Sequence, residues 1–496
     1  MNGAMIRYIL GYVLKIEAVL MLVPCITSLC YREHEGIFFL GTGAAAFLLG
    51  VLMTLKKPEK TVFYLKDGCV ATSLSWIFLS VFGALPFVLT GEIPNVINAL
   101  FETVSGFTTT GASILANVEG LSHTALIWRS FTHWIGGMGV LVFLLAIIPL
   151  SGGSNINLMR AESPGPSVGK FYPKVKNTAR ILYMIYIGMT AVMFLLLLAG
   201  HMPVFDAICT SVGTAGTGGF GIKNESLASY SPYIQWVTAV FMVLFSVNFN
   251  AYYYIIYRQF KKAFQMEEVK YYLLIILAAS LFIMGNILCT MDIRGGVFDA
   301  LTQSVFQVTS VISSTGFSSV DFNLWPAASK TVLVLLMFIG ACAGSTGGGI
   351  KISRIIILLK TMIKELQSYL HPKSIVKINM EKKPVEHEVI RSTNVYFITF
   401  MLLFAISVFL VSLEGKDLVT NFTAVIATLN NIGPGLSKVG PAGNFDGLGS
   451  FSKCVLIFDM LAGRLELFPI LLLFHPVLWK ETLLAKRTAW RRKGRG

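Results

Sequence analysis

Long apolar runs without a charged residue constrain this chain more than any other feature. Residues 181–200 and 234–257 are two such runs, and neither contains a charged side chain. A helix needs about 20 predominantly apolar residues to cross the hydrocarbon core of a bilayer. Charged residues make up only 13% of the chain, against roughly 25% in soluble domains. The sequence therefore predicts an integral membrane protein, and it excludes disordered, collagen-like and disulfide-stapled classes.

Ten apolar segments are long enough to be membrane spans. They lie at about 5–30, 36–55, 68–90, 124–150, 178–200, 232–257, 271–290, 331–360, 393–413 and 453–478. The first could also be a cleaved signal peptide, since Arg7 precedes an apolar stretch that ends near Cys30. We favour an uncleaved helix, because Lys15 and Glu17 interrupt the run and no small-residue cleavage pattern is present.

The basic residues gather on one side of the predicted spans. The connections 55–66, 151–177, 258–270, 351–391 and 479–496 hold 28 Lys and Arg, whereas the alternate connections hold 6. By the positive-inside rule the first set faces the cytoplasm, and so do both termini. A net charge of +14 could also indicate nucleic-acid binding, but this placement favours orientation and contact with anionic lipid. We expect no nucleic-acid partner.

No constellation of catalytic or metal-ligating residues stands out. The seven cysteines are scattered and form no CxxC pair. Gly216–Gly221 matches GxGxxG, but it lies between two spans rather than in a βαβ unit. Gly344–Lys351 resembles a phosphate loop but misses the GxxxxGK[ST] spacing. His133 stands alone in the fourth span, so packing or a helix contact is favoured over metal binding.

The connections on the outer side contain a fourfold repeat. Phe101–Gly111 aligns with Phe306–Gly316, with Phe, Ser and Gly at the same offsets. Looser copies end in Gly216–Gly221 and Asn430–Gly435. The sequence therefore predicts an N-terminal helix pair, residues 1–60, followed by four pore repeats. The four repeats are placed at 61–170, 171–265, 266–375 and 376–496. The third is expected to have a broken second helix, and the fourth includes a basic cytoplasmic tail.

Each repeat is predicted to fold as helix, re-entrant loop and helix. Irregular backbone at membrane depth is tolerated only where it is buried in protein or lines a water-filled cavity. The C-terminal end of a short half-helix favours a cation, and glycine allows the turn that follows it. Four such segments around one axis would form a ring of carbonyls that replaces the hydration shell of a cation. Extracellular Gly/Thr-rich turns are the alternative, but four copies on one side favour a pore.

Four stretches carry a family resemblance: His133–Gly139, Gly340–Lys351, Asn430–Gly435 and Gly463–Glu466. On them, the sequence resembles the Trk/Ktr/HKT superfamily of cation transporters, and its TrkH-type bacterial subunits in particular, over nearly the whole chain. The expected fold is all-α and polytopic, with about ten transmembrane helices. Four helix–pore loop–helix repeats surround one central pore.

The resemblance also implies a selectivity filter with one segment from each repeat. The filter glycines map to Gly111, Gly219, Gly316 and Gly433, and glycine at all four positions implies a preference for potassium. The second repeat departs most from the pattern, so the choice between Thr217 and Gly218 as a ligand stays open. The candidate potassium-binding residues are Thr109, Thr110, Gly111, Thr217, Gly218, Gly219, Ser314, Thr315, Gly316, Asn431, Ile432 and Gly433.

A second glycine-rich stretch, residues 340–349, interrupts the predicted span 331–360. Each glycine costs about 1 kcal/mol in a helix relative to Ala, so a continuous helix is not expected there. A small-residue helix contact is one alternative. We favour an irregular loop across the pore beneath the filter, which the resemblance identifies as a gating loop. The gate candidates are Gly344, Ser345, Thr346, Gly347, Gly348, Gly349, Lys351 and Arg464.

Arg464 is the gate candidate outside the loop, near the middle of the last predicted span. An unpaired Arg in a membrane costs at least ~2.5–3.5 kcal/mol, so it must face a cavity or find a partner. Asp459 and Glu466 are the candidate partners, and a structural ion pair is the alternative role. At ~7 Å and an effective dielectric constant near 20, a guanidinium repels a monovalent cation by about 2.4 kcal/mol.

The predicted function is potassium uptake through a gated filter, driven by the membrane potential, in a chain that is not an enzyme. Potassium is the substrate, and no cofactor is expected on this chain. The resemblance implies a bacterial cytoplasmic (inner) membrane, a homodimer and a cytoplasmic RCK-type subunit that binds a nucleotide, NAD or ATP/ADP. Residues 258–270 and 351–391 are its expected docking surfaces. Two alternatives stay open: a proton- or sodium-coupled symporter of the same fold, and a membrane-embedded enzyme using His133, Asp459, Arg464 and Glu466.

Overall fold

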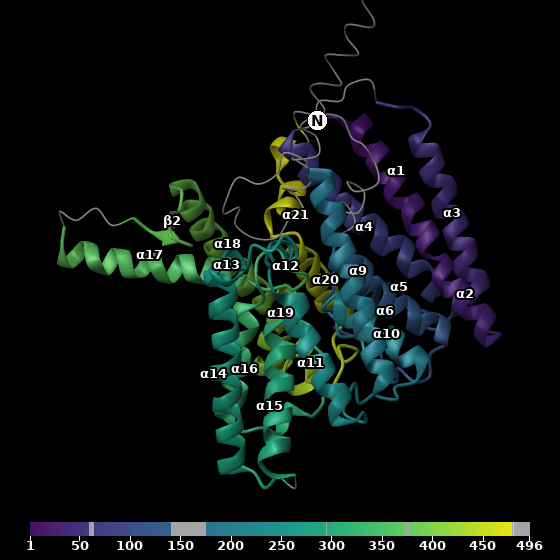
Figure 1. The fold of residues 1–496 in the computed structure, drawn as a ribbon. Helices are drawn as coiled ribbons and strands as arrows, with labels where there is room; N and C mark the ends of the chain where they lie inside the picture. Colours follow the sequence, from purple (N-terminus) through teal and green to yellow (C-terminus); the bar gives the residue numbers. More distant parts are fainter. Residues whose placement is uncertain (59–63, 140–174, 294, 373–376, 479, 481–496) are drawn as a thin grey trace, which may run out of the picture.

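The structure is a computed structural model that describes residues 1–58, 64–139, 175–293, 295–372, 377–478 and 480. The described chain is mostly helical (Figure 1). Its strands are β1 (Asn379–Met380) and β2 (Lys383–Pro384), which form one short antiparallel pair. The basic tail and the predicted repeat boundaries near 60, 170 and 375 lie outside the described residues.

An N-terminal helical hairpin precedes the repeats. It consists of α1 (Gly3–Leu20), α2 (Leu22–Tyr31) and α3 (Gly36–Thr54). Asn2 begins α1 by accepting a hydrogen bond from the Met5 N–H. Gly11 of α1 and Gly50 of α3 allow the two backbones to approach closely, because a Cβ on Gly11 would lie 2.8 Å from the Gly50 oxygen. The hairpin lies at one side of the molecule (Figure 1).

Four units of the same design follow, which confirms the predicted fold class. Each has a long first helix, a short pore helix and a second helix. The first unit holds α4 (Leu65–Thr90), α5 (Val96–Phe107) and α6 (His123–Gly137), and the second α9 (Val175–Ala199), α10 (Val204–Ala215), α11 (Pro232–Ser246) and α12 (Phe249–Ile256). The third holds α14 (Glu267–Thr290), α15 (Gly296–Ile312), α16 (Ala327–Ile339) and α17 (Ile352–Leu370), and the fourth α18 (His387–Ser412), α19 (Leu418–Leu429), α20 (Ser450–Arg464) and α21 (Phe468–Leu473). A short helix, α13 (Phe260–Phe264), links the second and third units.

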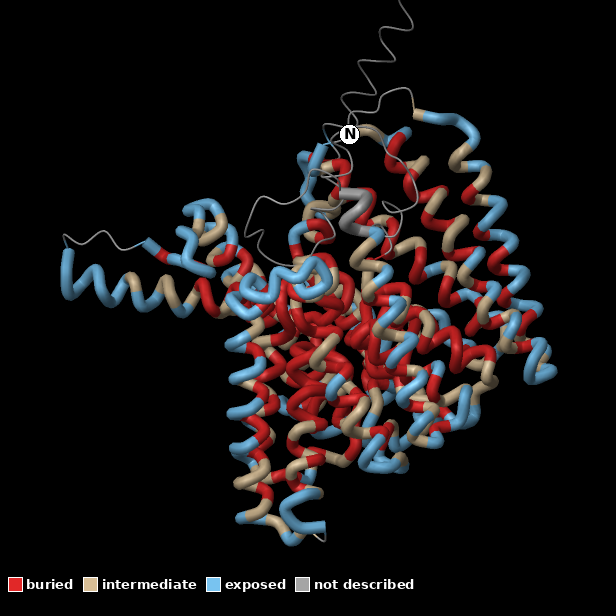
Figure 2. The backbone as a smooth tube through the Cα atoms, in the orientation of Figure 1, coloured by how far each residue is buried: buried red, intermediate tan, exposed pale blue. Residues whose placement is uncertain are grey.

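Three of the four pore helices are too short to cross a membrane, and two of the four begin at a side-chain cap. Three of them, α5, α10 and α19, have 12 residues. Asn95 caps α5 through the Ile97 N–H, and Asp417 caps α19 through the Thr420 N–H. The C-terminal halves of the pore helices are buried, and buried backbone fills the middle of the molecule (Figure 2).

Six helices in the described residues are long and apolar enough to cross a membrane, or seven if one bent pair counts as a span. The bent pair is α11 and α12, which meet at 89°. The segment predicted as a span at 232–257 is therefore sharply bent. The segment predicted at 453–478 is also interrupted, because Glu466 (φ 58°) and Leu467 (φ 65°) have left-handed backbone between α20 and α21. The span predicted at 124–150 ends as a helix at Gly137, and its remainder lies outside the described residues.

The span predicted at 331–360 is broken as expected. α16 ends at Ile339, and α17 begins at Ile352. The intervening residues, 340–351, are called the gate loop below. α17 then leaves the bundle at a steep angle to α14 (Figure 1). Each second helix is thus interrupted or ends partway, which leaves room for irregular backbone inside the bundle.

Candidate ion filter and gate

The four pore helices end in the same backbone motif. In the first repeat, the Thr109 N–H donates to the Gly106 oxygen (3.1 Å), and the Thr110 N–H donates to the Ser105 oxygen (2.9 Å). This pair of bonds is the Schellman motif. The other repeats form the same pairs: Thr217–Thr214 and Gly218–Gly213, Ser314–Val311 and Thr315–Ser310, Asn431–Thr428 and Ile432–Ala427.

The filter segments are residues 109–111, 217–219, 314–316 and 431–433. Each contains two residues with left-handed backbone. The third residue is the predicted glycine, with φ of 79° at Gly111, 74° at Gly219, 84° at Gly316 and 99° at Gly433. The first residue is never glycine: it is Thr109 (56°), Thr217 (55°), Ser314 (57°) or Asn431 (53°). Left-handed backbone is unusual for β-branched residues, and such strain concentrates at functional sites. All of these residues were predicted to lie in the filter, but the left-handed backbone of the first residue in each segment was not predicted.

The filter segments form a closed ring, and each glycine faces the backbone of another repeat. A Cβ on Gly111 would lie 2.0 Å from the Gly218 oxygen, and one on Gly219 would lie 1.9 Å from the Thr315 oxygen. A Cβ on Gly316 would lie 2.1 Å from the Ile432 oxygen, and one on Gly433 would lie 2.7 Å from the Thr110 oxygen. The contacts therefore run from repeat one through two, three and four and back to one. The structure brings all twelve predicted filter residues together and leaves no room for a side chain at the glycines.

Side chains brace the ring unequally. Hydroxyl pairs stand behind the first and third segments: Thr108 and Thr110 Oγ1 lie 2.8 Å apart, and Ser313 Oγ lies 2.7 Å from Thr315 Oγ1. Asn431 joins the fourth repeat to the first, because its Nδ2 donates to Thr110 Oγ1 (2.9 Å). The second segment has glycine at the two positions that carry hydroxyls in the first and third.

The gate loop is anchored to the break between α11 and α12. The Cys342 N–H donates to the Ser246 oxygen (3.1 Å), and the Phe249 N–H donates to the Gly344 oxygen (3.1 Å). Glu268 of α14 adds a buried anchor, since its carboxylate accepts from the Ala343 N–H (2.6 Å). The broken helix therefore supplies backbone partners that a continuous helix could not offer.

The glycines of the gate loop lie against the filter. The Gly348 N–H donates to the Ser314 side chain. A Cβ on Gly347 would lie 2.7 Å from the Ser313 oxygen, and one on Gly348 would lie 2.3 Å from the Asn430 oxygen. At the end of the loop, Lys351 donates through Nζ to the Gly347 oxygen. The loop is thus packed against the third and fourth filter segments.

Arg464 bridges the gate loop and the end of α6. Its guanidinium donates to the Thr346 oxygen (2.9 Å), to the Gly137 oxygen (2.9 Å) and to the Gly136 oxygen. The two carboxylates expected beside it have other partners. Glu466 forms an ion pair with Arg354, and Asp459 accepts from the Ser407 hydroxyl (2.7 Å).

The residues of the enzyme alternative have separate partners. His133 Nδ1 donates to the Gly106 oxygen (2.8 Å), which differs from the partners of Asp459, Arg464 and Glu466 described above. Among the described residues, no group of three or more His, Cys, Asp or Glu could hold a metal ion.

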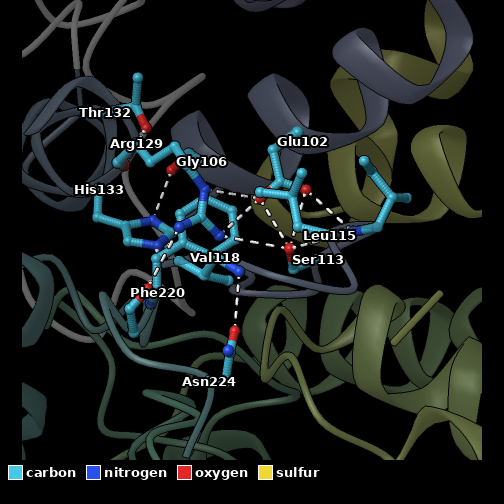
Figure 3. Close-up of polar contacts among 12 residues, drawn as sticks. Glu102, Gly106, Ser113, Leu115, Val118, Arg129, Thr132, His133, Phe220 and Asn224 are labelled. Carbon is cyan, nitrogen blue, oxygen red and sulfur yellow. Dashed lines mark hydrogen bonds and ion pairs between the residues drawn. The ribbon is translucent and has the colours of Figure 1, made fainter. Parts of the chain in front are cut away.

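One buried ion pair behind the filter was not predicted from the sequence: Glu102 of α5 and Arg129 of α6 (Figure 3). The Arg129 Nε–Glu102 Oε1 distance is 2.8 Å, and both side chains are almost fully buried. Glu102 also accepts from the Ser113 hydroxyl and from the Ile114 N–H (3.0 Å), just beyond the filter. A charged residue within an apolar pore helix was the available signal, since a buried charge requires a partner.

Comparisons with known proteins agree with this geometry. Residues 36–291 and 294–482 match the family described as TrkH, cation transport protein. The chain is 34% identical to the Trk system potassium uptake protein TrkH of Salmonella typhimurium, and 33% identical to that of Escherichia coli K12; each alignment covers 97% of this chain and the whole relative. It also superimposes on the crystal structure of the potassium transporter TrkH from Vibrio parahaemolyticus, with a TM-score of 0.87 and 30% identity over 97% of this chain and 100% of that one. This chain therefore belongs to the TrkH family of cation transport proteins.

Proposed function

We propose that this chain takes up potassium across the membrane through the ring formed by residues 109–111, 217–219, 314–316 and 431–433. The observation that carries the proposal is the closed order of the contacts, in which each filter glycine abuts a backbone oxygen of another repeat. A ring of backbone oxygens can replace the hydration shell of a cation. The names of the relatives, potassium uptake proteins, support potassium as the substrate.

The gate loop and Arg464 control passage in this proposal. The loop packs against the filter backbone, and Arg464 donates to it through the Thr346 oxygen. A guanidinium at this depth adds an electrostatic barrier to a cation. Opening requires the loop to leave the filter and Arg464 to give up the Thr346 contact. The membrane potential drives the ion inward through the open gate.

The proposal extends to partners and location. α17 exposes an apolar surface made of Leu359, Met362, Ile363, Leu366 and Leu370. A second copy of the chain, packed on this surface, would cover it and form a homodimer. We place the chain in a bacterial cytoplasmic membrane with both termini inside, and we assign the nucleotide to a cytoplasmic regulatory subunit that docks at residues 258–270 and 351–391.

Rubidium uptake into proteoliposomes of the purified chain tests the function. The vesicles carry a negative-inside potential set by a proton gradient and a protonophore, and potassium or sodium is added as competitor. We expect uptake that follows the potential and is blocked by potassium but not by sodium. Uptake that stays locked to a sodium or proton gradient would instead identify a symporter. No flux, with or without the regulatory subunit, would overturn the proposal.

A further inference from the structure

The second helix of repeat one differs from its three counterparts where it faces the filter. The eleventh residue of α6 is His133, whereas the eleventh residues of α11, α16 and α20 are Met242, Met337 and Met460. All four side chains are fully buried. Repeats two, three and four therefore have a flexible apolar side chain at this position. Repeat one has an imidazole, whose two ring nitrogens require hydrogen-bond partners when buried.

Both nitrogens of His133 bond to backbone that adjoins the filter. Nδ1 donates to the Gly106 oxygen of α5 (2.8 Å), so the ring is in the tautomer whose Nε2 accepts. That Nε2 accepts from the Phe220 N–H at 3.3 Å, and Phe220 directly follows the filter glycine Gly219. One side chain thus connects the pore helix of repeat one to the filter segment of repeat two (Figure 3).

The filter segment of repeat two is shaped around this ring. A Cβ on Gly218 would lie 2.1–2.5 Å from atoms of the His133 ring, and one on Gly216 would lie 2.1 Å from the His133 oxygen. In repeats one and three, the equivalent two positions carry the hydroxyl pairs that brace the filter. Repeat two therefore lacks its own braces, and the imidazole of repeat one occupies the space of the missing side chain.

Phe220 is fixed from two directions. The centre of the Phe220 ring lies 4.3 Å from the centre of the His133 ring. The Arg129 guanidinium lies 4.2 Å from the centre of the Phe220 ring. Arg129 also donates to the Gly221 oxygen (3.2 Å). The segment that leaves the filter is thereby held in place, so the His133 bond acts on a backbone with little freedom to adjust.

We propose that His133 is a positioning residue that holds the filter segment of repeat two at the spacing that selects potassium over sodium. The inference rests on the proposed function. Selection between the two ions depends on the size of the oxygen cage or on the number and field of its carbonyls. A segment that loses its brace relaxes, and the cage then adapts to the smaller sodium ion.

The test replaces His133 with the residue that the other repeats use. His133→Met keeps a buried side chain but removes both hydrogen bonds. We expect the preference for potassium over sodium, measured as competition against rubidium uptake, to fall at least about tenfold, since the loss of one buried hydrogen bond already corresponds to about that factor. His133→Gln can donate to Gly106 and accept from Phe220, so it should recover part of the preference. Met337→Leu, at the equivalent position of repeat three, is the matched control.

The outcomes separate this inference from the function on which it rests. Absence of potassium-selective uptake in the unsubstituted chain would refute the proposed function itself. A selective parent with an equally selective His133→Met variant would overturn the role of His133 alone. Equal losses in His133→Met and Met337→Leu would show that packing, rather than the imidazole, is responsible. Thermal unfolding of each variant provides the check that a lost preference does not reflect a lost fold.

Discussion

Repeats one and three have nearly the same filter but different support behind it. Both end their pore helix in a Schellman motif, and both brace the filter with a hydroxyl pair. Behind the first lies the buried Glu102–Arg129 pair, whereas the third has Gln307, which donates to Ser319 (3.4 Å). The seventh residue of the second helix is Arg129 in repeat one and Leu333 in repeat three. The local backbone motif therefore fixes the filter, and its support can vary.

The largest expected effect comes from the filter glycines. Gly111→Ala and Gly316→Ala would each place a Cβ about 2 Å from the oxygen of another repeat, at a φ that alanine resists. We expect each to lower potassium uptake by at least about 100-fold, a loss equal in the two repeats. Gly285→Ala in α14, where a Cβ meets no atom within 4 Å, is the control. Normal uptake by either filter variant would argue against the ring.

The next test replaces the buried Glu102–Arg129 pair of repeat one with Gln and Leu, the residues at the equivalent positions of repeat three. Glu102→Gln leaves Arg129 buried without its carboxylate, and we expect the free energy of unfolding to fall by about 3–5 kcal/mol. Adding Arg129→Leu removes the orphaned charge and should restore most of that loss. Thermal unfolding of the purified variants measures both. If the double variant is no more stable than the single one, the two supports are not interchangeable.

Arg464 connects the two repeats, since it donates to the gate loop of repeat three and to the end of α6 in repeat one. We expect Arg464→Ala to raise potassium flux in the closed state, by up to about 50-fold if the barrier of about 2.4 kcal/mol is lost. Arg464→Lys keeps the positive charge but loses the paired hydrogen bonds of the guanidinium. It therefore separates the electrostatic barrier from the hydrogen bonds that hold the gate loop to α6. Unchanged flux through a folded alanine variant would count against a gating role.

The smallest expected effect concerns the start of the second helix. Glu33 accepts from the His123 and Thr124 N–H groups at the start of α6 (2.9 Å each), whereas α16 has no side-chain cap. Burial acts to raise the pKa of Glu33, but hydrogen bonds from the Thr124 hydroxyl, from these two N–H groups and from the His123 side chain outweigh it and hold the pKa below its ordinary value. We expect Glu33→Gln to cost about 1 kcal/mol at pH 7.

The pH dependence of that cost follows from the lowered pKa of Glu33. A carboxyl group with a lowered pKa stabilises the fold above its unfolded pKa, and this stabilisation is lost as pH falls through the folded pKa. The difference in stability between Glu33→Gln and the parent should therefore begin to shrink as pH falls below about 4.3, the ordinary pKa of Glu, and continue to shrink as pH falls through the folded pKa. A gap that persists at acid pH would show that the variant disturbs packing instead. Thermal unfolding at pH 7 and pH 3.5 distinguishes the two.

The repeats and the filter glycines were predictable from the sequence because they depend on local pattern. Span length, basic loops and recurring glycines indicate topology directly. The gate loop was also expected, since glycines at 340–349 disfavour a helix. The breaks at 247–248 and 465–467 were not expected, because neither position has clustered glycines. At the first break, the Ser246 oxygen and the Phe249 N–H bond to the gate loop, and at the second, Glu466 pairs with Arg354 of α17.

Side-chain partners behind the filter were the least predictable part. Arg464 was placed near Asp459 or Glu466 by proximity in sequence, yet its bonds reach Gly137 and Thr346. His133 was expected to make a helix contact, and its partners lie 27 and 87 residues away. The positive φ of Thr109 and Ser314 has no sequence signature, since Thr and Ser favour other conformations. Such contacts depend on how the four repeats assemble.

The closed ring has a consequence for how this protein can change over generations. In a channel assembled from four identical subunits, one codon alters all four quarters of the filter together. Here each quarter has its own codons, and the glycine of one segment faces an oxygen of another. A single mutation therefore changes one quarter against three that stay constant. Under the proposed function, ion preference can therefore shift one quarter at a time, and the four quarters already differ: they read Thr-Thr-Gly, Thr-Gly-Gly, Ser-Thr-Gly and Asn-Ile-Gly.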